Sequence, residues 1–180
     1  MRLLPTLPLL IFVGLASVGS AQSRHDSSAP IDFSAAHQEF DDRAKRVVLS
    51  GDVVVRQSEM TLSAARMSIA YSGDIFGGGS PQASRVDASG GVTLTRPDQT
   101  ARSQYAIYDL NRRVVTMIGN VSLRQSNGNV INGGRLTFNL DTNRATIDGS
   151  SVGGGAPGTT EAAPGGRVTG RFSVPKRDDK

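Results

Sequence analysis

Three stretches of the chain repeat one pattern of alternating apolar residues with a glycine at the centre. Because alternate residues of an extended chain lie on the same face, each stretch predicts a strand with one apolar face that includes the glycine. The glycines follow one another at spacings of 39 and 29 residues, which indicates one supersecondary unit copied along the chain. The stretches are residues 47–55, 86–94 and 115–123, centred on positions 51, 90 and 119.

Partner strands and turns complete each repeat. Apolar residues alternate again over 65–71, 101–107 and 134–140, and their opposite-face neighbours, Ala106 among them, are small or polar as a solvated face requires. Polar turns rich in Asp or Asn precede the glycine strands, for example at Asp41–Lys45 and Asp109–Arg113. The longer first spacing is explained by an insertion at Ser72–Ser84, which contains three consecutive glycines and predicts a surface loop.

The two ends of the chain read differently from the repeats. Met1-Arg2, an apolar run over 7–18 and the small residues 19–21 predict a cleaved signal peptide, residues 1–21, and hence an exported protein. A disordered leader is expected at 22–29 and the folded domain at 30–149. A Gly/Pro-rich linker at 150–166, a closing strand at 167–174 and a charged tail at 175–180 are expected to follow.

Composition excludes several classes of protein. The chain has no Cys, so neither a disulfide nor a lipid attached to cysteine is possible. Its net charge is +4, but the basic residues are scattered among acidic ones and no aromatic-studded basic face accompanies them. No nucleic-acid partner is therefore expected.

The chemistry of a catalytic site is missing from the sequence. The two histidines are His25, in the leader, and His37, beside a predicted turn, so no zinc set can be assembled. Ser34 is a weak nucleophile candidate beside His37, and the acidic residues cluster in turns, where solvation explains them. The sequence therefore predicts no catalytic residue, no metal, no cofactor and no enzyme activity.

The apolar faces leave two interpretations open. Curved hairpins could enclose a slot lined by aliphatic and aromatic side chains, or the faces could pack together as an ordinary sandwich core. Periodicity alone favours the packed core, since apolar faces usually pack on each other.

At this point the residues resemble a known family. The segments Leu49–Gln57, Ala88–Leu94 and Met117–Gln125, with their Asp-containing turns, are similar to the OstA-like repeat of the LptA family of lipopolysaccharide-transport proteins. The resemblance covers about residues 30–149, and Arg167–Val174 is similar to the family's closing strand. It implies an all-β fold, an open twisted β-jellyroll of stacked antiparallel strands with an apolar interior.

The resemblance also implies a function and its residues. The interior would bind the acyl chains of lipopolysaccharide, lipid A or a related glycolipid, and edge strands would dock neighbours by β-augmentation, bridging an inner-membrane LptC-like and an outer-membrane LptD-like component with possible head-to-tail self-association. Edge docking is expected at Ile31, Phe33, Ala145, Ile147 and Phe172. The groove lining is expected at Val53, Val55, Met67, Ile69, Val92, Leu94, Tyr105, Ile107, Val121, Leu123, Leu136 and Phe138.

Two further hypotheses remain open at this stage. One is a periplasmic scaffold, or a membrane-associated component of the same pathway, with no lipid cargo of its own. The other is an enzyme or carbohydrate-binding β-sandwich, which a loss of hydrolysis on changing His37 would favour. The identity of the glycolipid and the role of the Gly-rich insertion at 76–79 are left open by the sequence.

Overall fold

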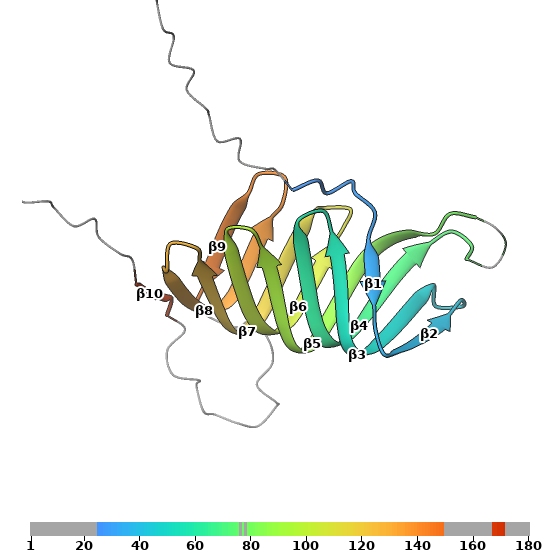
Figure 1. Ribbon diagram of the computed structural model, residues 1–180, viewed down its shortest axis with the longest axis horizontal. Helices are drawn as coiled ribbons and strands as arrows, with labels where there is room; N and C mark the ends of the chain where they lie inside the picture. Colours follow the sequence, from blue (N-terminus) through green and yellow to red (C-terminus); the bar gives the residue numbers. More distant parts are fainter. Residues whose placement is uncertain (1–24, 76, 78, 150–166, 172–180) are drawn as a thin grey trace, which may run out of the picture.

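A computed structural model describes residues 25–75, 77, 79–149 and 167–171, and these form one open sheet of ten antiparallel strands (Figure 1). This confirms the all-β fold, an open β-jellyroll of antiparallel strands, that the family resemblance implies. The predicted signal peptide, linker and charged tail lie outside the described residues. The strands are β1 (Asp32–Ser34), β2 (His37–Asp41), β3 (Arg46–Gln57), β4 (Met60–Ser72), β5 (Gln82–Arg96), β6 (Gln99–Asp109), β7 (Val114–Gln125), β8 (Val130–Asn139), β9 (Arg144–Asp148) and β10 (Thr169–Arg171).

Most strands pair with the strand that precedes or follows them in the chain. β3 to β8 pair successively as hairpins, β1 and β2 both pair with β3 at one edge, and β9 and β10 both pair with β8 at the other. The paired stretches on each edge strand are separate: β2 pairs with residues 46–50 of β3, whereas β1 pairs with residues 54–56. The open edges are therefore each made of two short strands.

The sheet bends along one line, which the glycines mark. Gly90 and Gly91 have φ of 84° and 80°, and the pairs at 51–52 and 119–120 are also left-handed. The hydrogen-bonded register shifts at each of these places, for instance between Ser50 and Val53 on β3. Such two-residue irregularities are β-bulges, and consecutive left-handed residues turn the strand sharply.

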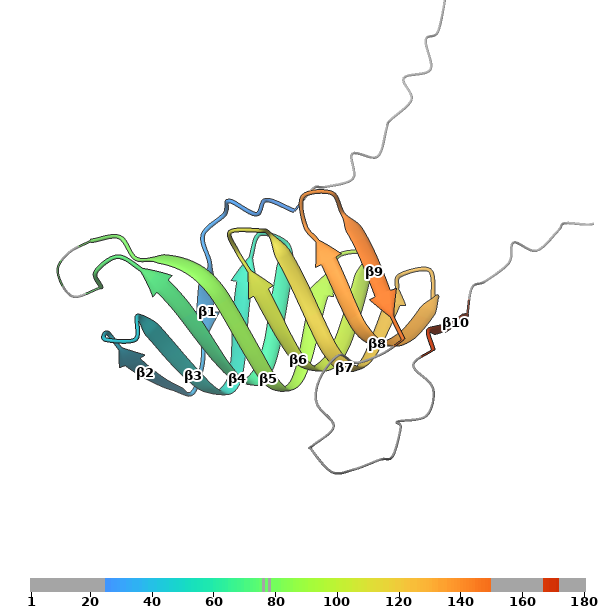
Figure 2. The same ribbon diagram turned by 180° about the vertical axis from the view of Figure 1, so that it is seen from behind.

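The bend folds the sheet into two facing layers, with the connecting turns gathered along the opposite rim (Figures 1 and 2). We call the layer that contains β2 and β9 layer A, and the layer that contains β1 and β10 layer B. In layer A lie residues 46–50, 66–72, 82–89, 105–109, 114–118 and 135–139; in layer B lie residues 53–57, 60–64, 92–96, 99–103, 121–125 and 130–133. Alternate residues of both layers are buried between them, and this set forms the core.

The bend corrects the expected position of the glycines. Gly51 and Gly90 are exposed and Gly119 is half-buried, so they do not share the apolar face of their strands. At each glycine bulge the flanking buried positions are four residues apart, as Leu49 and Val53 are, so the alternation before and after the glycine stays in phase.

The turns before the glycine strands share one construction. The Oδ1 atoms of Asp41, Asp109 and Asn139 each accept a hydrogen bond of 2.9 Å from the backbone N–H three residues later. Each turn ends on a left-handed residue, with φ of 49° at Lys45 and 57° at Arg113. The side chain thus replaces a backbone acceptor, which explains why Asp or Asn opens each turn.

Two expected boundaries are wrong. The insertion was expected to span Ser72–Ser84, but β4 runs to Ser72 and β5 begins at Gln82, with Tyr71 opposite Ala83. Residues 25–29, expected within a disordered leader, are held at the rim, where the carbonyls of Ser27 and Ala29 accept hydrogen bonds from Gln57 Nε2 at 3.1 and 2.9 Å. The leader is fixed by hydrogen bonds to a residue 28 to 30 positions away, and the strand ends are fixed by pairing across the loop. Local composition reveals neither contact.

Candidate functional site

The interior between the layers is the candidate site, and most of the predicted lining lies in it. These side chains are at most 5% exposed and alternate with less buried neighbours along β3, β4, β5, β7 and β8. Their inward orientation is what a groove lining requires, while contact with a lipid stays a prediction. The residues are Val53, Val55, Met67, Ile69, Val92, Leu94, Val121, Leu123, Leu136 and Phe138.

Two predicted lining residues face outward instead. Tyr105 is 55% exposed and Ile107 is half-buried, whereas their neighbours Ala106 and Tyr108 are buried. The register of β6 shifts between Arg102 and Tyr105, so the strand changes phase by one residue after Ser103. Because the side-chain period of a strand is two, that single step exchanges the two faces.

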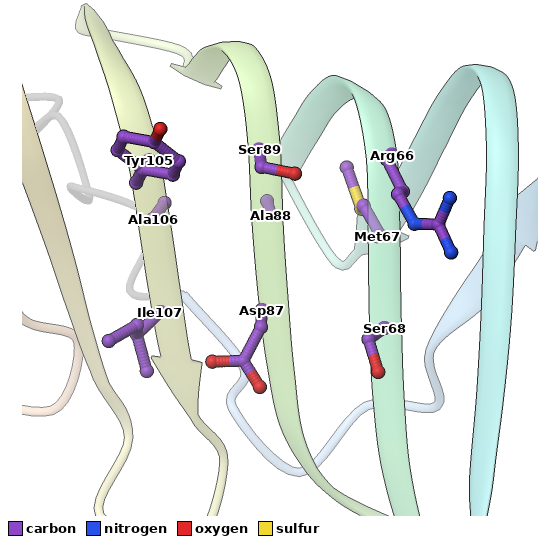
Figure 3. A pocket seen from close by; sticks show the side chains of 9 residues that line it. All are labelled: Arg66, Met67, Ser68, Asp87, Ala88, Ser89, Tyr105, Ala106 and Ile107. Carbon is purple, nitrogen blue, oxygen red and sulfur yellow. The ribbon is translucent and has the colours of Figure 1, made fainter.

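Tyr105 and Ile107 belong to a depression on the outer face of β4, β5 and β6 (Figure 3). In Figure 3 they stand on β6, beside Ser89 and Asp87 of β5 and across from Arg66 and Ser68 of β4. Asp87 is paired with Arg85 at 2.7 Å. The depression is therefore separate from the interior, from which the sheet itself divides it.

Several interior residues were not predicted from the sequence. Tyr108 is fully buried, and Met60, Leu62 and Ala64 on the first half of β4 are at most 6% exposed. The alternation of apolar and small polar residues over 60–64 was the available signal, but β4 was expected only from residue 65. Ala64 and Met67 are both buried because β4 carries a register shift between Ser63 and Arg66.

The interior between β5, β6, β7 and β8 is filled by its own side chains. Leu94, Leu123, Leu136 and Phe138 surround a cavity of only about 10 Å³, together with Arg96, Gln99 and Ala101. This volume holds no more than about one water molecule. In the form described, the layers are thus in contact, and any acyl chain would have to displace side chains or separate the layers.

Polar contacts near the rim join the two layers. The hydroxyl of Tyr108 in layer A donates to Gln57 Oε1 in layer B at 2.6 Å, and Gln57 Nε2 donates to the leader. Arg96 Nη1 in layer B donates to Oδ1 of Asn143, in the turn after β8, at 2.9 Å, and its guanidinium lies 4.5 Å from the Phe138 ring centroid. The rim is therefore joined by a few hydrogen bonds, whereas the bend is continuous backbone.

Burial raises the pKa of Tyr108 to about 12. The unfolded chain has a tyrosine pKa of about 10, so the folded state holds this proton more tightly. The resulting stabilisation is fully present below pH 10 and is lost as the pH rises toward 12. We expect the free energy of unfolding to fall by about 2 to 3 kcal/mol across this interval from Tyr108 alone.

Urea unfolding followed by circular dichroism at pH 9 and pH 12 measures this effect. The variant Tyr108→Phe should lack that part of the pH dependence while losing about 1 kcal/mol at pH 9, where the hydrogen bond to Gln57 is removed. Equal alkaline destabilisation of the variant and the parent protein would assign the effect to other groups.

Both sheet edges carry predicted docking residues. Phe33, which is 42% exposed, lies on β1, and Ile31 lies immediately before that strand. Ala145 and Ile147 lie on β9. Phe172 lies outside the described residues, although β10 immediately before it pairs with residues 130–132 of β8. The edges have one unpaired side each, as docking by strand addition requires, while the docking itself stays a prediction.

The described residues contain no candidate metal site. Among them, no cluster of three or more His, Asp or Glu side chains could hold a metal ion. Within the same residues no helix is long and apolar enough to span a membrane.

Comparison with known proteins agrees with this architecture. A family model described as "LptA/(LptD N-terminal domain) LPS transport protein" matches residues 32–144. An uncharacterized protein of Rhizobium meliloti is 26% identical over 121 residues, which are 66% of this chain and 65% of that protein. The chain therefore matches just under two thirds of that relative's length.

A solved structure shows the same fold. The crystal structure of LptH, the LptA homologous periplasmic component of the conserved lipopolysaccharide transport device from Pseudomonas aeruginosa, superposes with a TM-score of 0.64 at 20% identity. The match covers 83% of this chain and 99% of that one. With a family model that covers more than half of the sequence, the chain belongs to the LptA and LptD N-terminal domain family of lipopolysaccharide-transport proteins.

Proposed function

We propose that this protein is a periplasmic lipopolysaccharide-transport protein that shields acyl chains between its two layers. The observation that carries the proposal is the apolar interior, which runs through every hairpin of the stack and ends at open sheet edges. Membership of the family supports the substrate class. The protein acts as a carrier and not as an enzyme.

The size of the hydrophobic effect explains why such an interior is needed. An acyl chain of about 12 methylenes costs roughly 10 kcal/mol to expose to water at about 0.8 kcal/mol per methylene. No transfer through an aqueous compartment is efficient at that cost without a continuous apolar cover. The interior supplies the cover, and the polar sugars of the glycolipid remain outside.

Lipid entry would require the layers to separate at the rim. The bend line is covalent and is built of left-handed residue pairs, whereas the rim is joined by the Gln57–Tyr108 and Arg96–Asn143 hydrogen bonds. Opening at the rim breaks a few polar contacts that water can replace, and the apolar side chains exposed by opening are then covered by acyl chains.

The edges would make the protein part of a longer bridge. β1 with β2 at one end and β9 with β10 at the other each present backbone groups to a further strand. We infer docking of an inner-membrane LptC-like component at one edge and an outer-membrane LptD-like component at the other, with head-to-tail copies of this chain between them. Ile31, Phe33, Ala145 and Ile147 would lie at these joints.

Competition between intact and deacylated lipopolysaccharide tests the proposal. The purified protein is expected to bind fluorescently labelled lipopolysaccharide, and intact unlabelled lipopolysaccharide should displace the label. Lipopolysaccharide stripped of its acyl chains by alkali should displace it at least a hundredfold less well, because it retains the sugars but lacks the apolar part. Equal competition by both would indicate sugar recognition and contradict the proposal.

The filled part of the interior between β5 and β8 favours one alternative, a scaffold of the same pathway without lipid cargo. Its lining already packs to a residual volume of about 10 Å³. A protein that binds no lipopolysaccharide, yet pairs with Lpt components through its edges, would fit this alternative.

A further inference from the structure

One charged side chain lies inside the apolar interior. Among the described residues, Arg96 is the only Lys, Arg, Asp or Glu that is buried, at 9% exposure. It occupies the inward phase of β5, two residues after Leu94 and four after Val92. Its guanidinium group therefore reaches from layer B toward layer A and stacks on Phe138.

The charge of Arg96 has no counter-ion in direct contact. None of the ion pairs formed by the described residues includes it, and its hydrogen bond goes to the neutral amide oxygen of Asn143. Asp98 and Glu59 favour its charged form through space, but burial outweighs them and lowers its pKa. A guanidinium has five N–H donors, so most of its hydrogen-bonding capacity is available to a ligand.

Arg96 also sits where an opening reaches the interior. The small cavity that it lines shares Gln99, Leu123 and Phe138 with a wider pocket of about 380 Å³. That pocket is lined further by Asn143, Ala145 and Ile147, and so lies at the β9 end of the stack. An apolar chain that entered there would pass over Phe138 and Leu123 with the guanidinium beside it.

We propose that Arg96, with Asn143 beside it, binds the acidic head group of a lipid whose apolar chain enters the interior at the β9 end. This inference rests on the proposed function and adds an anion contact to it. The positive charge of the Arg96 guanidinium is complementary to the negative charge of such a head group. An unpaired buried cation is costly, stacking on an aromatic ring offsets only part of the cost, and a chain-bound phosphate would neutralise it in bidentate geometry.

The alternative role for Arg96 is purely structural. Its hydrogen bond to Asn143 and its stacking on Phe138 join layer B to layer A, and neither contact requires a ligand. If Arg96 only joins the layers, loss of the guanidinium should lower stability without changing the preference among head groups. An anion site predicts a change in that preference, so head-group selectivity separates the two roles.

Calorimetric titration with two twelve-carbon amphiphiles below their micelle concentrations tests the site. The probes are dodecyl phosphate and dodecyldimethylphosphine oxide, which have the same chain and compact head groups but differ in charge. We expect the purified protein to bind the phosphate at least tenfold more tightly than the phosphine oxide. Arg96→Gln should abolish this preference and leave the affinity for the neutral probe within about twofold, a loss typical of removing one charged hydrogen-bond partner.

Two further variants control for folding and for general charge. Asn143 lies in an exposed turn, so Asn143→Asp should fold, place a carboxylate against the guanidinium and weaken dodecyl phosphate binding at least fivefold. Arg102→Gln removes an exposed arginine from the outer face of β6 and should change neither affinity. Circular dichroism confirms that each variant is folded.

The outcomes separate the inference from the function on which it rests. If the protein binds both probes equally, or if Arg96→Gln and Asn143→Asp keep the phosphate preference, the anion site is wrong while the acyl-binding interior stands. If the protein binds neither these probes nor lipopolysaccharide, the proposed function fails and the inference fails with it.

Discussion

The variant Leu136→Asp is expected to lose at least about 4 kcal/mol of folding free energy, enough to unfold many proteins of this size. Leu136 is fully buried on β8, opposite Met117 of β7 and Ile147 of β9. The change removes the transfer free energy of a buried leucine and places an unpaired carboxylate among aliphatic side chains. Urea unfolding followed by circular dichroism measures it, since the chain has no Trp.

The matched control is the next residue. Thr137 lies on the outer face between Thr116 and Thr146, so Thr137→Asp places the same carboxylate in contact with water. We expect a change within about 1 kcal/mol, as for surface substitutions in general. Similar losses from the two variants would contradict the assignment of the inner and outer faces. If Leu136→Asp folds and binds lipopolysaccharide as well as the parent protein, the interior is not the lipid site.

The second large effect is expected at the bend, for Gly90→Ala. Gly90 has φ of 84°, and a Cβ built on it would lie 2.8 Å from the Cβ of Ala65. Left-handed strain and the close contact together are expected to cost about 3 kcal/mol. The bend positions both layers, so the loss should appear in the global unfolding transition.

Two controls separate strain from contact. Gly91 also has a positive φ but meets nothing within 4 Å, and the equivalent position in the third repeat is Asn120. Gly91→Asn should therefore change stability by less than about 1 kcal/mol. Adding Ala65→Gly to Gly90→Ala removes the opposing Cβ and should recover part of the loss. No recovery would show that the contact with Ala65 contributes nothing.

The glycine strands could be predicted almost completely from their alternation, and a parity argument explains why. The bulge in β7 places Val121 four residues after Met117, an even step that leaves both on the inner face. The inner and outer faces of these strands are therefore assigned correctly even when the bend is not anticipated. The glycine itself was misplaced, because a residue pair that turns the chain belongs to neither face.

One partner strand, β6, was assigned partly to the wrong face for the complementary reason. β6 places Ala106 three residues after Ser103, an odd step that exchanges the faces, so Tyr105 and Ile107 were assigned inward while Tyr108 was missed. No glycine marks this irregularity in β6 itself. It arises because the bulges of β5 and β7 on either side must be matched, which is a property of the sheet and not of one strand.

The cross-layer contacts lay beyond sequence reasoning. Tyr108 and Gln57 are 51 residues apart, and Arg96 and Asn143 are 47 apart. Gln57 and Arg96 are the last residues of β3 and β5, next to turns, where a polar residue needs no explanation. Their burial follows from the folding of the sheet onto itself, which brings two separate sets of turns to one rim.

Photo-crosslinking from within the interior tests the central claim most directly. A light-activated aromatic residue would replace Leu136, or Thr137 as the outward-facing control, in cells that export the protein. The account predicts an acylated glycolipid adduct from position 136 and none from position 137. Folded, exported protein that gives no adduct at position 136 would show that the apolar interior is a packed core and would contradict the proposed transport function.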